Sequence, residues 1–258
     1  MTWSEQVALV TGASRGIGRA TALLMAARGA AVAVNYATSA AEADAVVGEI
    51  AALGGRAIAV GADVADPAQV TAMVARVAEA FGPVSILANN AGLSRQATLD
   101  TFDAAALAQM RRVNVDGPIA AIRAVMPGMR ERRYGRIVNV TSLAGIGTAL
   151  PGTAFYAGTK AELAILTRRF AMELGPFGIT VNAVTPGFIA TEMARASRSE
   201  SEWAETELGM SRRAMMGRIG TPADIANAVV FLAAPEAGFI TAQQIVVDGG
   251  RMDYLGHA

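Results

Sequence analysis

Short runs of β-branched and apolar residues alternate with longer alanine-rich segments along almost the whole chain of 258 residues. The alanine-rich segments repeat their apolar residues with the period of a helix, whereas the short runs have the composition of strands. Several of these runs are apolar throughout, as in a parallel sheet that is covered on both faces. The pattern therefore predicts an α/β fold with a doubly wound parallel sheet, helices on both faces and right-handed crossovers.

The expected strands are Val7–Thr11, Ala31–Asn35, Ala57–Gly61, Ile86–Ala88, Arg136–Thr141, Thr180–Val184 and Ile245–Val247. The expected helices are Ile17–Arg28, Glu42–Leu53, Ala68–Phe81, Leu107–Arg130, Phe155–Leu174 and Asp224–Leu232. We find no linker, repeat or low-complexity tract, and we predict a single domain over residues 1–258. The polar segment 188–217 interrupts the alternation after the sixth strand. Long irregular insertions are usually lids or disordered, and we expect a substrate lid here.

Composition and charge argue against several classes of function. The chain has no cysteine, so we expect neither disulfides nor a thiolate metal site, and we predict no metal centre. A formal net charge of zero argues against nucleic acid or an anionic membrane as the main partner. The N-terminus lacks the blocks of a signal peptide, and no apolar run is long enough to span a membrane. A cytoplasmic protein is the default expectation.

A glycine-rich stretch, Thr11-Gly12-Ala13-Ser14-Arg15-Gly16-Ile17-Gly18, joins the first expected strand to the first expected helix. Glycines allow a tight turn and the close approach of a diphosphate to backbone N–H groups, and the helix N-terminus favours negative charge. The spacing Gly-x3-Gly-x-Gly differs from the common Gly-x-Gly-x-x-Gly fingerprint. We interpret the stretch as a phosphate-binding loop. The alternative is a glycine-rich turn without a ligand.

The sequence Tyr156-Ala157-Gly158-Thr159-Lys160 places a phenol and an ammonium group one turn apart on the same face of an expected helix. A free tyrosine has a pKa of about 10 and exchanges protons poorly near neutral pH. A nearby lysine favours the phenolate, so we expect Lys160 to bring the pKa of Tyr156 toward neutrality. Taken alone, the pair is a weak signal, because tyrosine and lysine at this spacing are common on solvated helices.

Taken in order, Thr11–Gly18, Asn89-Asn90-Ala91-Gly92, Ser142, Tyr156 with Lys160, and Pro186-Gly187 resemble the motifs of the short-chain dehydrogenase/reductase family. The resemblance covers nearly the whole chain. It implies a Rossmann fold whose seven parallel strands have the order 3-2-1-4-5-6-7. It also implies a nicotinamide cofactor and hydride transfer between a carbonyl and an alcohol.

The resemblance assigns the reaction to four residues. Tyr156 is the general acid for carbonyl reduction and the base for alcohol oxidation, while Lys160 lowers its pKa and binds the nicotinamide ribose. Ser142 donates a hydrogen bond to the substrate oxygen. Asn114 helps to hold a water through which Lys160 exchanges protons with solvent. These roles suit the chemistry, because hydride addition leaves negative charge on the carbonyl oxygen and both Ser142 and Tyr156 can donate to it.

The resemblance also implies a set of cofactor-binding residues. Asp63 and Val64 match the family's adenine contact, and the backbone around Asn90 borders the adenosine. The complete set that we expect to bind the cofactor is Gly12, Ser14, Arg15, Gly16, Ile17, Gly18, Asn35, Tyr36, Thr38, Ser39, Asp63, Val64, Asn90, Ala91, Gly92, Tyr156, Lys160, Pro186, Gly187, Ile189 and Thr191.

The end of the second expected strand indicates which cofactor is used. NAD-dependent members usually carry an acidic residue there, but this chain has Asn35-Tyr36-Ala37-Thr38-Ser39. Arg15 stands where NADP-dependent members place a cation, and the hydroxyl groups of Thr38 and Ser39 can donate to a phosphate. We predict NADP(H) in preference to NAD(H), with dual use as the alternative.

The sequence leaves the substrate open between a ketone, a hydroxy compound and a 3-oxoacyl thioester. Arg133 matches one basic position with which relatives dock acyl carrier protein, but Phe177 stands at the other, which weakens that partner. The alternatives are an NAD-linked polyol or sugar dehydrogenase and a nucleotide-binding sensor or scaffold without turnover. Long alanine-rich helices with apolar residues on more than one side indicate a partner surface. In the family that the chain resembles, the matching helices form one contact between subunits and the last helix and strand form another, which implies a homotetramer.

Overall fold

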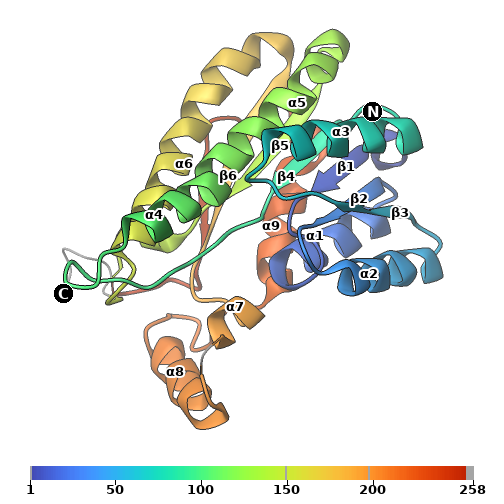
Figure 1. The fold of residues 1–258 in the computed structure, drawn as a ribbon. Coiled ribbons are helices and arrows are strands. Elements are labelled where there is room, and N and C mark those ends of the chain that lie inside the picture. Colours follow the sequence, from blue (N-terminus) through green and yellow to red (C-terminus); the bar gives the residue numbers. More distant parts are fainter. Residues whose placement is uncertain (1, 149, 197, 254–258) are drawn as a thin grey trace.

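The computed structural model describes residues 2–148, 150–196 and 198–253, and these residues contain one sheet of seven parallel strands (Figure 1). The order β3-β2-β1-β4-β5-β6-β7 confirms the predicted topology. The strands are β1 (Val7–Val10), β2 (Ala31–Tyr36), β3 (Arg56–Gly61), β4 (Ile86–Asn89), β5 (Gly135–Val140), β6 (Ile179–Pro186) and β7 (Gln244–Val247).

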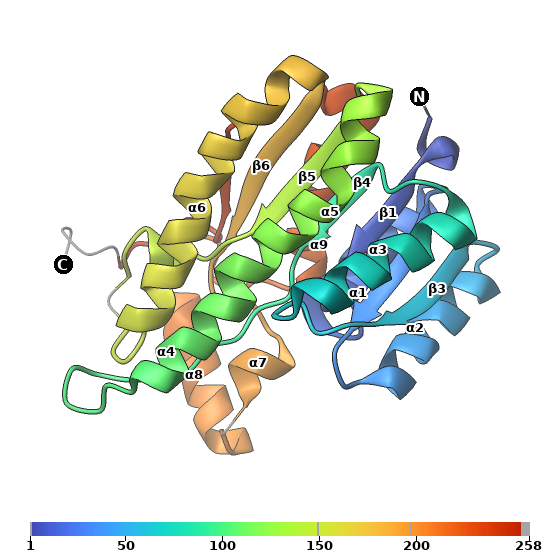
Figure 2. The ribbon, with the colours of Figure 1, turned by 45° about the horizontal axis from the view of Figure 1, so that its top comes forward.

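Helices cover both faces of the sheet (Figures 1 and 2). The helices α1 (Gly16–Ala27), α2 (Ala40–Ala52) and α9 (Pro222–Ala233) pack on one face, and α3 (Pro67–Phe81), α5 (Gly117–Arg132) and α6 (Ala154–Leu174) pack on the other. In β1, Ala8 and Val10 face the first layer and Leu9 faces the second, which explains why this strand is apolar at every position. Short 3₁₀ turns occur at Trp3–Glu5, Leu143–Gly145, Gly175–Phe177 and Pro235–Ala237. Within the described ranges, no helix is both long and apolar enough to cross a membrane.

The helix predicted over Leu107–Arg130 is broken. It consists of α4 (Ala104–Arg111), a π-helical turn over Arg112–Asp116, and α5. Asn114 lies in this turn, where its Nδ2 donates to the Leu93 carbonyl oxygen at 2.8 Å and to Thr159 Oγ1 at 3.0 Å, while its Oδ1 accepts from the Leu93 N–H at 2.8 Å. These partners come from distant parts of the chain, so the local sequence carries little sign of the break.

Residues 188–217, which we call the insert, lie beyond the carboxyl ends of the strands (Figures 1 and 2). The insert contains α7 (Glu192–Arg195) and α8 (Glu200–Arg212), so it is partly helical. Its role as a substrate lid stays a prediction. A capping box begins α8: the Ser199 hydroxyl accepts from the Glu202 N–H at 3.3 Å, and the Glu202 carboxylate accepts from the Ser199 N–H at 2.7 Å. Phe188 and the buried Trp203 stack with ring centroids 6.0 Å apart, which ties α8 to the chain leaving β6.

Candidate active site

The glycine-rich loop turns tightly between β1 and α1. Gly12 and Gly16 have φ angles of 60° and 55°, in the left-handed region that glycine adopts without strain. A methyl group on Gly18 would lie 2.5 Å from the side-chain nitrogen of Asn90, so no larger residue fits there without a shift. The backbone path therefore requires glycine at these positions.

Asn35 supports this loop from the end of β2. Its buried side chain accepts from the Gly12 N–H at 3.2 Å and donates to the carbonyl oxygens of Val60 and Ala62 at 3.2 and 3.0 Å. These partners occupy both the oxygen and the nitrogen of the amide. The structure thus gives Asn35, predicted to bind the cofactor, a place in the scaffold under the loop.

Asn90 and Thr11 fasten the loop to the end of β4. The Asn90 side chain donates to the carbonyl oxygens of Thr11 and Gly12, each at 2.9 Å. In return, Thr11 Oγ1 accepts from the N–H groups of Asn90 and Ala91, each at 3.0 Å. The part played by the Thr11 hydroxyl was not predicted, although its position at the head of the glycine-rich stretch was a signal for it.

The first turn of α1 is open to an anion. Arg15 is its N-cap residue and makes no side-chain capping bond, whereas Asp66 caps α3 by accepting from the N–H groups of Ala68 and Gln69. Uncapped N–H groups at a helix N-terminus attract negative charge. The loop therefore fits the diphosphate of a dinucleotide, as the sequence led us to expect.

Lys160, Tyr156 and Ser142 come together at the carboxyl end of β5. Lys160 is buried, and its Nζ donates to the carbonyl oxygen of Val140 at 2.9 Å. The same Nζ lies 6.0 Å from the centroid of the Tyr156 ring. The sequence did not indicate the Val140 carbonyl as a partner, because any residue type at that position would supply it.

Burial controls the protonation of this cluster. It raises the pKa of the Tyr156 phenol, against the opposite effect of a hydrogen bond with Ser142. It also lowers the pKa of Lys160 to about 8. The pKa of Tyr156 therefore lies above its ordinary value and not closer to neutrality, because removal from water disfavours both charged groups and is the largest effect on each. The effect of Lys160 itself on the phenolate stays a prediction.

Asn114 lies next to Lys160, with Gly92 between them. A methyl group on Gly92 would lie 3.5 Å from Asn114 Oδ1 and 3.5 Å from Lys160 Nζ. Thr159 connects the π-helical turn to α6, since its hydroxyl accepts from Asn114 and donates to the Tyr156 carbonyl oxygen at 2.8 Å. Thr159 was not predicted as part of the site, although it is enclosed by the motif of Tyr156 and Lys160.

The positions predicted to contact the adenosine end lie after β2 and β3. Asp63 is exposed and accepts from the Ala65 N–H at 2.9 Å, as in a turn. Thr38 is exposed, and Ser39 begins α2 without a capping bond. Arg15 is exposed as well, and it forms no ion pair with any part of the chain that the structure describes. These hydroxyl groups and this cation are thus free to meet a ligand.

The start of α7 approaches the glycine-rich loop. A methyl group on Gly16 would lie 3.6 Å from Thr191 Cγ2 and 3.5 Å from Glu192 Oε2. Between β6 and α7, Ile189 is buried. The chain from the end of β6 to α7 therefore runs past the loop, as expected from the place of Ile189 and Thr191 in the predicted cofactor set.

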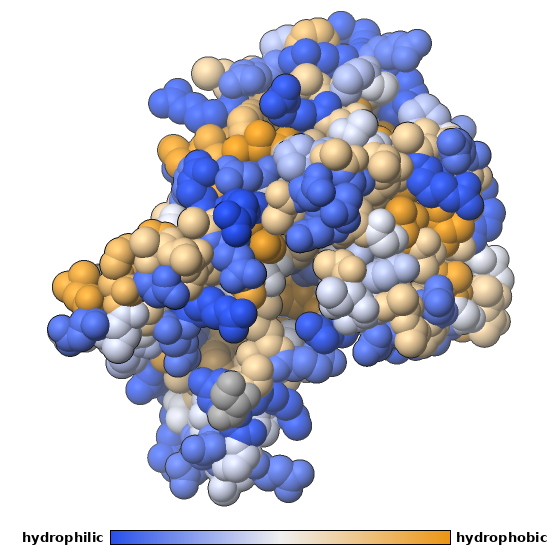
Figure 3. Space-filling view, in the orientation of Figure 1, coloured by the Kyte–Doolittle hydropathy of each residue, from blue (hydrophilic) through white to orange (hydrophobic). Residues whose placement is uncertain are grey.

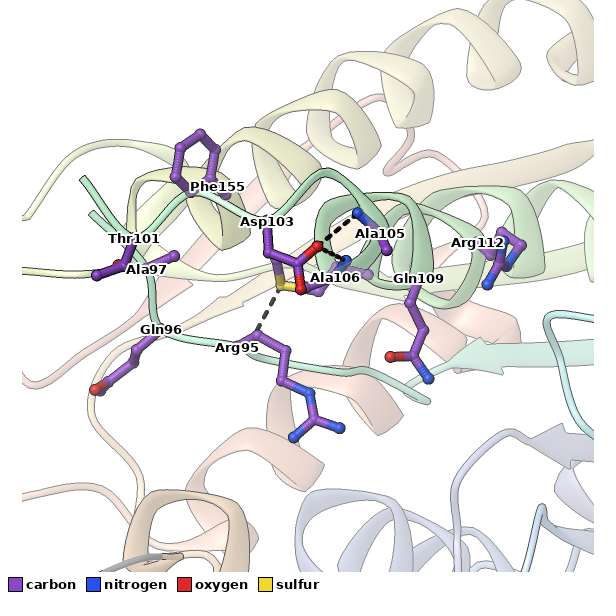
Figure 4. A pocket seen from close by; sticks show the side chains of 11 residues that line it. Arg95, Gln96, Ala97, Thr101, Asp103, Ala105, Ala106, Gln109, Arg112 and Phe155 are labelled. Carbon is purple, nitrogen blue, oxygen red and sulfur yellow. Dashed lines mark hydrogen bonds between the residues drawn. The ribbon is translucent and has the colours of Figure 1, made fainter. Parts of the chain in front are cut away.

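A cavity of about 630 Å³ lies beside Phe155, the neighbour of Tyr156 in α6 (Figure 4). Arg95, Gln109 and Arg112 follow one another along its border. The other residues that line it are Gln96, Ala97, Thr101, Asp103, Ala105, Ala106 and Met110. The Asp103 carboxylate caps α4 by accepting from two N–H groups. Ser142, Tyr156 and Lys160 are not among the residues that line this cavity.

The comparison with known families agrees with this geometry. The family model described as enoyl-(acyl carrier protein) reductase matches residues 12–251. The chain belongs to the short-chain dehydrogenase/reductase family. A short-chain dehydrogenase/reductase is an oxidoreductase that acts on carbonyl or alcohol groups with a nicotinamide dinucleotide. The uncapped N-terminus of α1 suits the binding of the dinucleotide, and the Tyr156 cluster suits the reaction. Among the described residues, no group of His, Asp and Glu side chains could hold a metal ion.

Similar members of the family match this short-chain dehydrogenase/reductase over most of their length. The short-chain reductase protein NovJ of Streptomyces niveus is 43% identical over 249 residues, which are 96% of this chain and 94% of NovJ. The 3-oxoacyl-(acyl-carrier-protein) reductase of Synechocystis sp. is 43% identical over 250 residues, which are 96% of this chain and 98% of that protein. A short chain dehydrogenase from Burkholderia cenocepacia, solved in complex with NADP, has a TM-score of 0.85 and 41% identity, and the match covers 95% of this chain and 97% of that one.

Proposed function

We propose that this enzyme reduces a ketone or a 3-oxoacyl thioester with NADPH. The observation that carries the proposal is the cluster of Ser142, Tyr156 and buried Lys160 at the carboxyl end of β5, where doubly wound sheets bind their ligands. Because burial raises the pKa of Tyr156, the phenol keeps its proton near neutral pH, as a general acid requires.

In the proposed reaction NADPH supplies the hydride for the carbonyl carbon. Negative charge then develops on the carbonyl oxygen, and the hydroxyl groups of Ser142 and Tyr156 donate hydrogen bonds to it. Tyr156 passes its proton to that oxygen, which completes the alcohol. Lys160 is mostly charged at neutral pH, since its pKa is about 8, and stabilises the phenolate that remains. Asn114 holds a water next to Lys160 through which the proton is replaced.

The preference for NADP(H) is supported by the residues after β2. Residues 37–39 include no carboxylate that would repel a 2′-phosphate, and they offer the hydroxyl groups of Thr38 and Ser39. The exposed guanidinium of Arg15 is free to pair with the phosphate. The relative from Burkholderia cenocepacia that was solved with NADP further supports this choice.

A 3-oxoacyl substrate is supported by the relatives named as 3-oxoacyl-(acyl-carrier-protein) reductases. The guanidinium of Arg130 lies 4.6 Å from the centroid of the Phe177 ring, and Arg133 donates to the Pro176 carbonyl oxygen at 2.8 Å. Cations therefore flank Phe177, although residue 177 itself is not basic. This basic surface supports an acidic carrier protein as one form in which the thioester is delivered.

We further propose that the insert covers the substrate and that the protein is a homotetramer. The insert has the exposed apolar side chains of Met193, Leu208, Met215 and Met216, which suit a cover for an apolar substrate. The helix α6 and the region of α9 carry separate exposed apolar residues on opposite faces of the sheet, as a molecule with two self-complementary contacts requires.

A cofactor-oxidation assay tests the proposed reaction. Purified protein is mixed with NADPH or NADH and either a 3-oxoacyl thioester or a simple ketone. In a second set of reactions it is mixed with NADP or NAD and a polyol. We expect loss of NADPH absorbance with the thioester or a ketone, at a higher kcat/KM than with NADH. Turnover of the polyol with NAD alone would contradict the proposal and favour the alternative reaction.

A further inference from the structure

The carboxylate of Glu192 faces the glycine-rich loop. Glu192 is the first residue of α7, and its Oε2 lies 3.5 Å from the point where a side chain on Gly16 would begin. Gly16 in turn is the first residue of α1, whose N-terminus has no side-chain cap. A negative charge of the insert therefore lies at the same helix end that fits the diphosphate of the cofactor.

A carboxylate and a phosphate are attracted to a helix N-terminus by the same partial positive charge. Glu192 is exposed and forms no ion pair within the described residues. A diphosphate bound at α1 would have this carboxylate as a close neighbour. Two negative charges that lie close together repel each other even in a partly solvated site.

We propose that Glu192 competes with the cofactor diphosphate for the N-terminus of α1, and that it thereby lowers cofactor affinity and speeds cofactor release. The inference rests on the proposed binding of a nicotinamide dinucleotide at this loop. Without the cofactor, attraction between Glu192 and α1 draws the insert toward the loop. With the cofactor, repulsion replaces this attraction and favours exchange, the step that limits turnover in many enzymes with moving segments.

Glu192→Gln tests the proposal, because it removes the charge and keeps the shape of the side chain. We expect the variant to bind NADPH and NADH about three- to tenfold more tightly, by the same factor for both, since both carry the same diphosphate. The gain should shrink as the salt concentration rises. Adenosine, which has no phosphate, should bind both proteins equally, and stopped-flow displacement should show slower NADPH release from the variant.

Glu207→Gln is the matched control, because Glu207 is also an exposed acid of the insert but lies on α8. It should leave both affinities unchanged. The inference is overturned if Glu192→Gln binds the dinucleotides no more tightly than the wild type, or if Glu207→Gln shows the same gain. Both results leave the proposed function intact, whereas a wild-type protein that binds neither dinucleotide would refute the proposed function itself.

Discussion

Lys160 Nζ donates a hydrogen bond of 2.9 Å to the carbonyl oxygen of Val140, the last residue of β5. The bond connects α6 to the sheet and keeps the amine away from water. Lys160 is only 3% exposed. An amine donates this bond whether or not it is charged. The structure therefore fixes the position of Lys160, and burial at the same time disfavours the charged form of its amine.

The pKa of Lys160 predicts how stability depends on pH. Burial lowers this pKa from 10.5 to about 8 in the folded protein, so between these pH values the unfolded chain binds one proton more and stability rises with pH. Relative to Lys160→Met, the wild type should gain up to about 3 kcal/mol of unfolding free energy across this window. Urea unfolding of both proteins at several pH values measures the difference, and a difference that does not change with pH would contradict the prediction.

Tyr156→Phe should nearly abolish turnover and leave NADPH binding almost unchanged. The variant loses the acidic proton but keeps the ring, and general acid–base groups typically contribute about 10²–10⁴-fold to the rate. Steady-state kinetics and a fluorescence titration with NADPH measure the two effects. Tyr134→Phe is the control, because Tyr134 lies just before β5, at the end of this strand opposite to the Tyr156 cluster. A near-normal kcat for Tyr156→Phe would refute its role.

Arg15→Ala should weaken the binding of NADPH much more than that of NADH. A hydrogen bond to a charged group contributes about 1.5–3 kcal/mol, which corresponds to roughly ten- to a hundredfold in affinity. Titration calorimetry with both cofactors measures the ratio. Arg28→Ala, an exposed arginine at the other end of α1, is the control and should change neither affinity. Equal losses for the two cofactors would show that Arg15 does not contact the 2′-phosphate.

Asn35→Ala should lower stability even when no cofactor is present. The substitution leaves the Gly12 N–H and the carbonyl oxygens of Val60 and Ala62 without their amide partner in a buried place. The cost of unsatisfied buried groups predicts a loss of about 2–4 kcal/mol in unfolding free energy. Denaturant unfolding measures it, with Thr38→Ala as an exposed control that should leave stability unchanged. Normal stability of Asn35→Ala would mean that Asn35 serves the ligand and not the scaffold.

The strands and the glycine-rich loop could be predicted from the sequence because their signals are local, whereas the order of the strands was implied by the resemblance to the family. Each strand is a short β-branched run, and Gly12, Gly16 and Gly18 stand where the backbone path needs them. The sequence also contains the capping box of α8, in which Ser199 is followed three residues later by Glu202. We did not predict this helix because the insert is polar.

Other features depend on contacts between distant segments and could not be predicted. Hydrogen bonds from Asn114 to Leu93 and Thr159 accompany the break between α4 and α5. The sequence near Asn114 does not predict these bonds. Asn35 looks like a cofactor ligand at the end of a strand until its partners in the loop and in β3 are seen. The pKa of Tyr156 depends on burial, which spacing along a helix does not show.

Exposed apolar side chains lie on two opposite faces of the molecule. On α6, Ile165 and Met172 are 49% and 65% exposed, and their spacing of seven residues places them on one side of the helix. On the other face of the sheet, Phe231 of α9 is 53% exposed. Figure 3 shows apolar surface at the upper left, over the side of the molecule formed by α5 and α6. Such surfaces on a folded protein indicate contacts with partners.

We expect the wild type to be a tetramer that can be dissected into two different dimers. Joint Ile165→Glu and Met172→Glu substitutions should place charges in the contact through α6 and leave dimers held by the α9 face, because two independent self-complementary contacts build the closed tetramer. Phe231→Glu should leave dimers held by α6, and the triple variant should be monomeric. Light scattering measures each mass, and circular dichroism shows whether each variant remains folded. A wild-type monomer at micromolar concentration would refute the assembly, and dissociation of both contacts by Phe231→Glu alone would show that they are not independent.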